Sequence, residues 1–191
     1  MKHSLFTNRL KLAVFSQSHV SELVRLNADP EVIHYFPATL NTEESAALLQ
    51  RIIEHQLING YSLFALHLKE SDAFVGWCGL MKVHFSAHFT PAVEVGWRLN
   101  KIFWGKGLAS EAAKSILRFG FLDLGLSKIV SFTAELNQPS IRVMQKIWMK
   151  CNPEDTFDHP KLPVNHPLQR HILYRSQKTD WLEHYETSEM P

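Results

Sequence analysis

The pattern of apolar positions changes from strand-like to helical within residues 92–124. Over residues 93–99 apolar and polar residues alternate, and this period of two is typical of a β-strand. From Leu108 to Leu124 the apolar residues recur every three or four positions, which predicts an amphipathic helix. The segment between the two elements contains Gly105 and Gly107, separated by one residue. The pattern therefore predicts a strand, a double-glycine turn and a long helix in succession.

The double-glycine turn is a candidate anion site. Glycine has no Cβ, so Gly105 and Gly107 let the backbone approach a ligand closely. The helix start that follows presents free amides and the positive end of the helix dipole, which favours a phosphate or pyrophosphate. A Walker loop requires a longer glycine spacing, and a dinucleotide fingerprint requires glycine or alanine where this chain has Ser110. The remaining alternative is a tight strand–helix connection that binds nothing.

Upstream of residue 92 the same reasoning predicts strands and two helices. We expect strands over residues 5–15, 62–68 and 73–84, and helices over residues 18–28 and 43–58. Thr42 is the expected N-cap of the second helix, and Gly60 is its expected stop.

Downstream of the central helix, we expect a strand over residues 128–135 and then a helix opened by Asn137. The proline-rich segment 152–168 is predicted to be a loop, followed by a last strand over 169–176, with Trp181 and Leu182 closing the fold. This order of elements indicates a mixed α/β domain.

Two motifs resemble a known enzyme family. The sequence Trp104-Gly-Lys-Gly-Leu-Ala109 resembles the Q/R-x-x-G-x-G/A turn of the GCN5-related N-acetyltransferases (GNAT), and Glu94-Val-Gly-Trp-Arg-Leu resembles the strand along which their acetyl-CoA lies. Trp104 stands where the motif usually has Gln or Arg. In this position the chain resembles the RimJ/RimL-like subgroup, whose members acetylate ribosomal-protein N-termini. The spacing of Asn137 and Ser140 resembles the fourth helix of that subgroup.

The resemblance covers nearly the whole chain and implies its fold. We expect an α/β, GNAT-like fold in a single acetyltransferase domain over residues 1–191. Its sheet is expected to be mixed and mostly antiparallel, with six to seven strands, a splay between the two central strands and about four flanking helices.

The resemblance also implies acetyl-CoA as the co-substrate. The amides of the turn would take the pyrophosphate, and the strand around residues 97–99 would pair with the pantetheine arm as with a neighbouring strand. Asn137 would bond the pantetheine from the other side, unless it serves only as a helix cap. The cofactor-binding residues expected are Trp97, Arg98, Leu99, Trp104, Gly105, Lys106, Gly107, Leu108, Ala109, Asn137 and Ser140.

Four residues are catalytic candidates. Glu94 is the first candidate for the base, since similar acetyltransferases often use a Glu on this strand; the alternative is a solvated strand carboxylate. Asp158 and His159 are second candidates, because the subgroup that the chain resembles can supply its base from the loop after the fourth helix. Histidine is suited to this role because an imidazole can accept a proton near neutral pH. Ser140 would donate to the departing thiolate unless it only caps the helix. Many relatives use a tyrosine at the position of Met144, which cannot donate.

Composition and charge limit the classes of binding partner expected for the chain. With 191 residues, 45% of them hydrophobic and 20% charged, the chain has the size and composition of one globular domain. A formal net charge of +1 gives no electrostatic footprint for nucleic acid or an anionic membrane, so we expect neither as a direct partner. The two cysteines, Cys78 and Cys151, argue against a disulfide framework, and a reducing cytoplasm is the expected location. The eleven histidines are scattered, without an H-E-x-x-H motif or a Cys/His cluster, so we expect no metal site.

The predicted function is acetyl-CoA-dependent N-acetylation of a primary amine by direct attack in a ternary complex. A protein or peptide N-terminus is favoured over a small amine or amino sugar, and the chain is expected to be a monomer or homodimer. Two alternatives stay open. One is an acyl-CoA-binding sensor without turnover, which Met144 and Trp148, where the subgroup usually has glycine, leave possible. The other is a nucleotide-binding α/β protein that uses the same turn.

Overall fold

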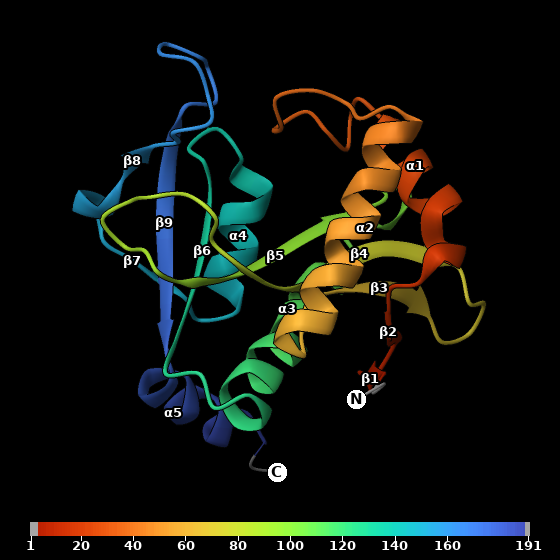
Figure 1. Ribbon diagram of the computed structural model, residues 1–191. Coiled ribbons are helices and arrows are strands. Elements are labelled where there is room, and N and C mark those ends of the chain that lie inside the picture. The colour runs from red at the N-terminus through yellow and green to blue at the C-terminus, as the bar shows by residue number, and fades with distance from the viewer. Residues whose placement is uncertain (1–3, 190–191) are drawn as a thin grey trace. The chain divides into compact units, whose positions relative to one another are not determined.

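A computed structural model describes residues 4–189 of the chain (Figure 1). The chain forms two compact units, and neither is a continuous stretch of sequence. The first unit contains the residues up to Met81 together with Gly96–Ile116. The second contains Lys82–Val95 and the residues from Leu117 onward. Strand β5 contributes residues to both.

The first unit is an antiparallel sheet covered by helices. Its strands are β1 (Leu5–Phe6), β2 (Leu10–Val14), β3 (Leu63–Leu68), β4 (Phe74–Lys82) and the end of β5 (Val93–Leu99). Strands β1 to β4 follow each other as antiparallel neighbours in order along the sheet. Helices α1 (Val20–Ala28) and α2 (Thr42–Asn59) pack on β3 through a shared hydrophobic core (Figure 1). The first turns of α3 (Leu108–Arg118) also belong to this unit.

The second unit is built around a long antiparallel pair. Strand β6 (Lys128–Ala134) pairs with β9 (Arg170–Gln177) along its whole length, and β7 (Lys150–Cys151) and β8 (Phe157–Asp158) also pair with β9. Strand β5 runs parallel to β6, with Glu94 opposite Val130. Its helices are α4 (Gln138–Lys146) and α5 (Lys178–Glu189), and a π-helical turn over Phe119–Asp123 continues α3.

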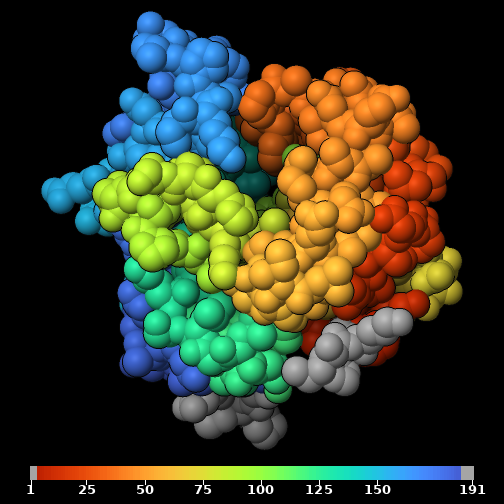
Figure 2. Space-filling view, viewed as in Figure 1, coloured from red at the N-terminus to blue at the C-terminus, as the bar shows by residue number. Residues whose placement is uncertain are grey.

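A hydrophobic core beneath the segment before β5 organises the second unit. Phe89 is buried with Val130, Phe157 and Leu173, and Phe85 packs against the same group. The yellow-green segment that carries Phe85 and Phe89 lies on the surface in Figure 2. These aromatic contacts hold that segment against β6, β8 and β9.

The predicted α/β class and the mixed, mostly antiparallel sheet are confirmed. Over residues 4–189 the sheet has nine strands rather than six to seven, and there are five α-helices rather than about four. The additional strands are the two-residue strands β1, β7 and β8, which are too short to produce an alternating pattern. The prediction of one domain over residues 1–191 stays a prediction.

Several predicted boundaries were wrong. The strand expected over residues 5–15 is a hairpin, because the Thr7 amide donates to the Leu10 carbonyl at 2.9 Å and the Thr7 hydroxyl accepts from the Leu10 amide at 3.0 Å. The N-cap of α2 is Asn41 rather than Thr42, since its side chain accepts from the Glu44 amide at 2.9 Å. The expected loop over 152–168 contains β8, and the chain end around Trp181 is the helix α5.

Candidate functional site

The predicted double-glycine turn joins β5 to α3 in the first unit. Gly105 and Gly107 have φ angles of +73° and +77°, a region that side chains with a Cβ rarely adopt. A Cβ at Gly105 would meet no atom within 4 Å, and one at Gly107 would meet only the Arg9 side chain at 3.6 Å. The backbone conformation, rather than crowding, therefore requires both glycines. The space next to them is open.

Helix α3 begins directly after this turn. The amide of Glu111 donates to the Gly107 carbonyl at 3.1 Å, which closes the first helical turn. The amides of residues 108–110 have no carbonyl four positions earlier within the helix to bond. They add partial positive charge to the amides of the turn, as an anion site requires.

A hydrogen-bonded anchor holds the turn against the β1–β2 hairpin. Arg9 donates to the Lys106 carbonyl at 2.9 Å through one guanidinium nitrogen and to the Glu111 carboxylate at 2.7 Å through Nε. Glu111 also accepts from the Thr7 hydroxyl at 2.6 Å and from the Arg9 amide at 2.8 Å. Because Arg9 donates to a carbonyl of the turn, it stabilises the conformation of the turn. The sequence analysis did not identify this pair, because Arg9 and Glu111 are distant from each other along the chain.

Trp104, the departure from the usual family motif, has a structural role. Its indole Nε1 donates to the Leu99 carbonyl at 2.8 Å, which ties the turn to the end of β5. The side chain remains 47% exposed. Leu108 is buried and anchors the helix start, whereas Lys106 is exposed beside the turn.

Arg98 on β5 is held inside the first unit. One guanidinium nitrogen donates to Asn27 Oδ1 at 2.5 Å, and the guanidinium carbon lies 4.0 Å from the Phe36 ring centre and 5.3 Å from that of Trp77. Desolvation lowers the pKa of Arg98 to about 10, and its Nε is buried without a hydrogen-bond partner in the described part of the chain. The side chain is thus occupied by protein partners. Trp97 and Leu99 flank it on the strand.

Glu94 lies on β5 in the second unit. Its side chain is only partly exposed, and burial raises its pKa to about 8. A carboxyl with this pKa changes charge near neutral pH, as a general base must. The predicted base is therefore placed in an environment that suits the role.

Asn137 and Ser140 lie together at the start of α4. Asn137 is buried, accepts from the Ser140 amide at 3.2 Å and donates to the Thr133 hydroxyl at 2.8 Å. Its helix-capping role is therefore present, and both ends of its amide are used. The Ser140 side chain is half-buried.

His159 lies in an aromatic cluster rather than at the end of a flexible loop. Its ring centre is 4.8 Å from those of Phe85 and His171, and desolvation together with the charge of His171 lowers its pKa to about 4. Its Nδ1 accepts from the Lys161 amide at 3.3 Å. The neutral ring then carries its proton on Nε2 and is a weak base. Of Glu94 and His159, the electrostatics favour Glu94 as the base. The other second candidate, Asp158, is exposed and pairs with Arg170 at 3.4 Å.

Comparison with known proteins decides the family. A family described as the acetyltransferase (GNAT) domain matches residues 9–150 of the chain. The chain belongs to the GNAT acetyltransferases. A relative named uncharacterized N-acetyltransferase YnaD, from Bacillus subtilis, is 31% identical over 175 residues, which cover 92% of this chain and 97% of the relative. The resemblance seen in the two motifs is thereby confirmed at the level of the family.

Solved GNAT structures share the fold. An acetyltransferase of the GNAT family from Bacillus anthracis superposes with a TM-score of 0.76 at 24% identity, covering 93% of this chain and 99% of that one. The ribosomal-protein-S5-alanine acetyltransferase of Vibrio fischeri superposes with a TM-score of 0.75 at 17% identity, covering 94% and 98%. At these identities the likeness shows the fold alone. The chain is an acetyl-CoA-dependent N-acetyltransferase of the GNAT family, whereas the RimJ/RimL-like subgroup stays a prediction.

None of the helices formed by residues 4–189 is both long enough and apolar enough to cross a membrane. The two cysteines are free, with Cys78 buried and Cys151 exposed.

Proposed function

We propose that this GNAT enzyme transfers the acetyl group of acetyl-CoA directly to a primary amine, with a protein or peptide N-terminus as the favoured acceptor. The observation that carries the proposal is the open double-glycine turn at Gly105 and Gly107, held from behind by Arg9. Its amides and those of the α3 start suit the pyrophosphate of acetyl-CoA. Nothing proposed here requires a metal ion.

The reaction needs a proton acceptor and a stabilised leaving group. The amine nitrogen attacks the thioester carbonyl, the carbon–sulfur bond breaks and CoA leaves as a thiolate. The attacking nitrogen belongs to the free amine, and Glu94, ionised above its pKa of about 8, takes the proton that this nitrogen loses once its bond to the carbonyl carbon has formed. Ser140 is the proposed donor to the thiolate. Asn137 is the proposed second partner of the pantetheine arm. Its side-chain amide would exchange one of its two hydrogen bonds within the protein for one to the ligand.

The acceptor class rests on narrower support. Trp104 and the Asn137–Ser140 spacing resemble the RimJ/RimL-like subgroup, and the ribosomal-protein-S5-alanine acetyltransferase of Vibrio fischeri has the same fold. We further propose a cytoplasmic location, as the free cysteines favour, and a monomer or homodimer. A small amine is the alternative acceptor.

The decisive experiment compares two glycine variants. Gly107→Trp places a bulky side chain in the proposed cradle, whereas Gly125→Trp places it at a glycine with a similar φ of +70° that lies outside the turn. We expect Gly107→Trp to weaken CoA binding by at least about 100-fold and Gly125→Trp to leave it unchanged, as measured by calorimetry. Equal affinity in all three proteins would remove the turn from the proposal.

Turnover separates an enzyme from a sensor. Release of free thiol from acetyl-CoA is measured with a panel of peptides that differ in their N-terminal residue, and with small amines. We expect the peptides to be acetylated faster. CoA binding without turnover on any amine would favour the sensor, for which Met144 is the relevant observation: it is fully buried where many relatives carry a tyrosine.

A further inference from the structure

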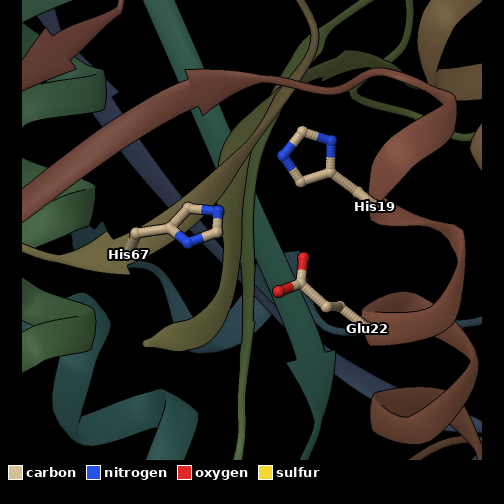
Figure 3. Close-up of side chains that lie close together, drawn as sticks. All are labelled: His19, Glu22 and His67. Carbon is tan, nitrogen blue, oxygen red and sulfur yellow. The ribbon is translucent and has the colours of Figure 1, made fainter. Parts of the chain in front are cut away.

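Three potential metal ligands that are not part of the double-glycine turn lie together on the first unit. His19 and Glu22 lie at the start of α1, and His67 lies on β3. Figure 3 shows their side chains facing a common space from the helix on one side and the strand on the other. One ligand atom from each residue lies within 4.8 Å of the other two. The proposed reaction uses none of these residues.

The ring of His67 is oriented as a ligand ring would be. Its Nδ1 lies 3.0 Å from the carbonyl oxygen of Asp72. Because a carbonyl can only accept, the proton of the neutral ring is on Nδ1 and the lone pair is on Nε2. A second-sphere bond of this kind is the usual way in which proteins fix a metal-binding imidazole.

His19 has a partner for its second nitrogen in either tautomer. Its Nδ1 accepts from the Ser16 amide at 3.0 Å, and the Ser16 carbonyl oxygen lies 3.2 Å from the same nitrogen. When Nε2 gives its lone pair to a cation, the proton moves to Nδ1 and is donated to that carbonyl. Cation binding therefore leaves no unpaired group on this ring, but it replaces the hydrogen bond from the Ser16 amide, because a protonated Nδ1 cannot accept.

Glu22 supplies the negative charge. It follows His19 by three residues, so both lie on the same face of the helix start. Glu22 forms no ion pair with any residue in the described part of the chain. Because metal ligands bind in their deprotonated forms, two imidazoles and one carboxylate together offer a cation a charge of minus one, which favours a divalent ion.

We propose that His19, Glu22 and His67 bind a divalent transition metal of the zinc type, with water in the fourth position. Two imidazoles and one carboxylate suit zinc, whereas calcium and magnesium prefer oxygen ligands. Tetrahedral ligands of zinc lie roughly 3.3 Å apart, so ligand atoms that lie up to 4.8 Å apart must approach each other by up to about 1.5 Å around the ion. The ion joins the start of α1 to β3 and stabilises the folded state by RT ln(1 + c/Kd), where c is the concentration of free metal ion. The sequence alone predicted no metal site, because His67 is far from the other two residues along the chain.

The test is a calorimetric titration of the untagged, chelator-treated full-length protein with Zn²⁺. We expect one equivalent to bind with a Kd of about 1 μM or tighter. His19→Gln and Glu22→Gln should each weaken binding at least about tenfold, and the double variant should abolish it. His34→Gln and Glu43→Gln, which change exposed residues of the same types outside the cluster, should bind as the wild type does.

A second readout reports the ligands directly. Co²⁺ bound at the site should give visible ligand-field bands that are absent in the double variant, and circular dichroism checks that each variant is folded. The proposal is overturned if the double variant binds Zn²⁺ with the wild-type affinity and stoichiometry. It is also overturned if the wild type binds no more tightly than about 1 mM.

Discussion

The protonation state of Glu94 governs the proposed chemistry at the residue scale. Because burial raises the pKa of its carboxyl to about 8, most molecules hold a proton at this site at pH 7. A general base works only when it is ionised. We therefore expect the rate of acetylation to increase as the pH rises above neutral. A solvated carboxylate would be ionised throughout the neutral range and would give no such increase.

The first prediction is that kcat/KM for a peptide acceptor rises with pH through about 8 and then levels. The peptide amine titrates in the same region, so two groups must lose protons and the logarithm of kcat/KM should rise with a slope near 2 at low pH. Glu94→Gln should lower the rate by roughly 10²–10⁴-fold and reduce that slope to about 1. Glu43→Gln, an exposed carboxyl on α2, is the control. A slope of 2 retained in Glu94→Gln would assign the base elsewhere.

The stability of the fold depends on how the charge of Arg98 is accommodated. Its guanidinium lies against the rings of Phe36 and Trp77 and donates to the side-chain amide of Asn27. Asn27 is fully buried, accepts from Arg98 and donates to the Ser45 hydroxyl at 3.1 Å. Asn27→Ala leaves a buried guanidinium without this acceptor. We expect the free energy of unfolding in urea to fall by roughly 2–4 kcal/mol.

Two further variants separate charge from packing in this cluster. Ser45→Ala, which removes only the other bond of Asn27, should cost about 1 kcal/mol. Adding Arg98→Met to Asn27→Ala should recover part of the loss, because the unpaired charge is then gone. This account would be contradicted if Asn27→Ala/Arg98→Met lost more unfolding free energy than the losses of Asn27→Ala and Arg98→Met added together.

At the scale of elements, Glu111 joins α3 to the β1–β2 hairpin. Burial alone would raise the pKa of Glu111, but hydrogen bonds from Thr7 and Arg9 and the charge of Arg9 outweigh it and lower the pKa. A carboxyl with a lowered pKa stabilises the fold above its unfolded value of about 4.3, and this stabilisation is lost as the pH falls through the folded pKa.

We therefore expect Glu111→Gln to lose about 1 kcal/mol of unfolding free energy at pH 7, and the difference from the wild type to shrink below about pH 4. Urea unfolding at the two pH values measures it. Asp123→Asn, which alters an exposed carboxyl on the same helical segment, should change stability by less than about 0.5 kcal/mol. A difference for Glu111→Gln that grows on acidification would mean that its pKa is raised.

Elements were predictable where the signal is local. The alternation over β5, the stripe of α3 and the Asn137 cap of α4 each depend on neighbouring residues, and all three are confirmed. Helix α5 was missed because its only clear apolar signal was Trp181 and Leu182. The glycine turn was predicted for the same local reason that β5 was. The raised pKa of Glu94, the Asn27–Arg98 bond and the weak basicity of His159 depend on contacts distant along the chain, so the sequence alone did not indicate them.

At the scale of the whole molecule, the path of the chain argues for one folding unit. Each compact unit is assembled from two separate stretches, and β5 contributes to both. Neither unit can therefore be completed by a continuous piece of the chain. Such interleaving favours cooperative unfolding, which would support the prediction of one domain over residues 1–191.

Cooperativity can be tested by destabilising one unit and observing the other. In a Trp148→Phe/Trp181→Phe background, the remaining tryptophans, Trp77, Trp97 and Trp104, all lie in the first unit. Leu173→Ala, in the core of the second unit, should cost roughly 2–5 kcal/mol. If the chain unfolds as one domain, this change lowers the midpoint reported by the first-unit fluorescence as much as the midpoint reported by far-ultraviolet circular dichroism. If the fluorescence midpoint stays in place while the dichroism signal splits into two transitions, the units unfold independently and the single-domain prediction is wrong.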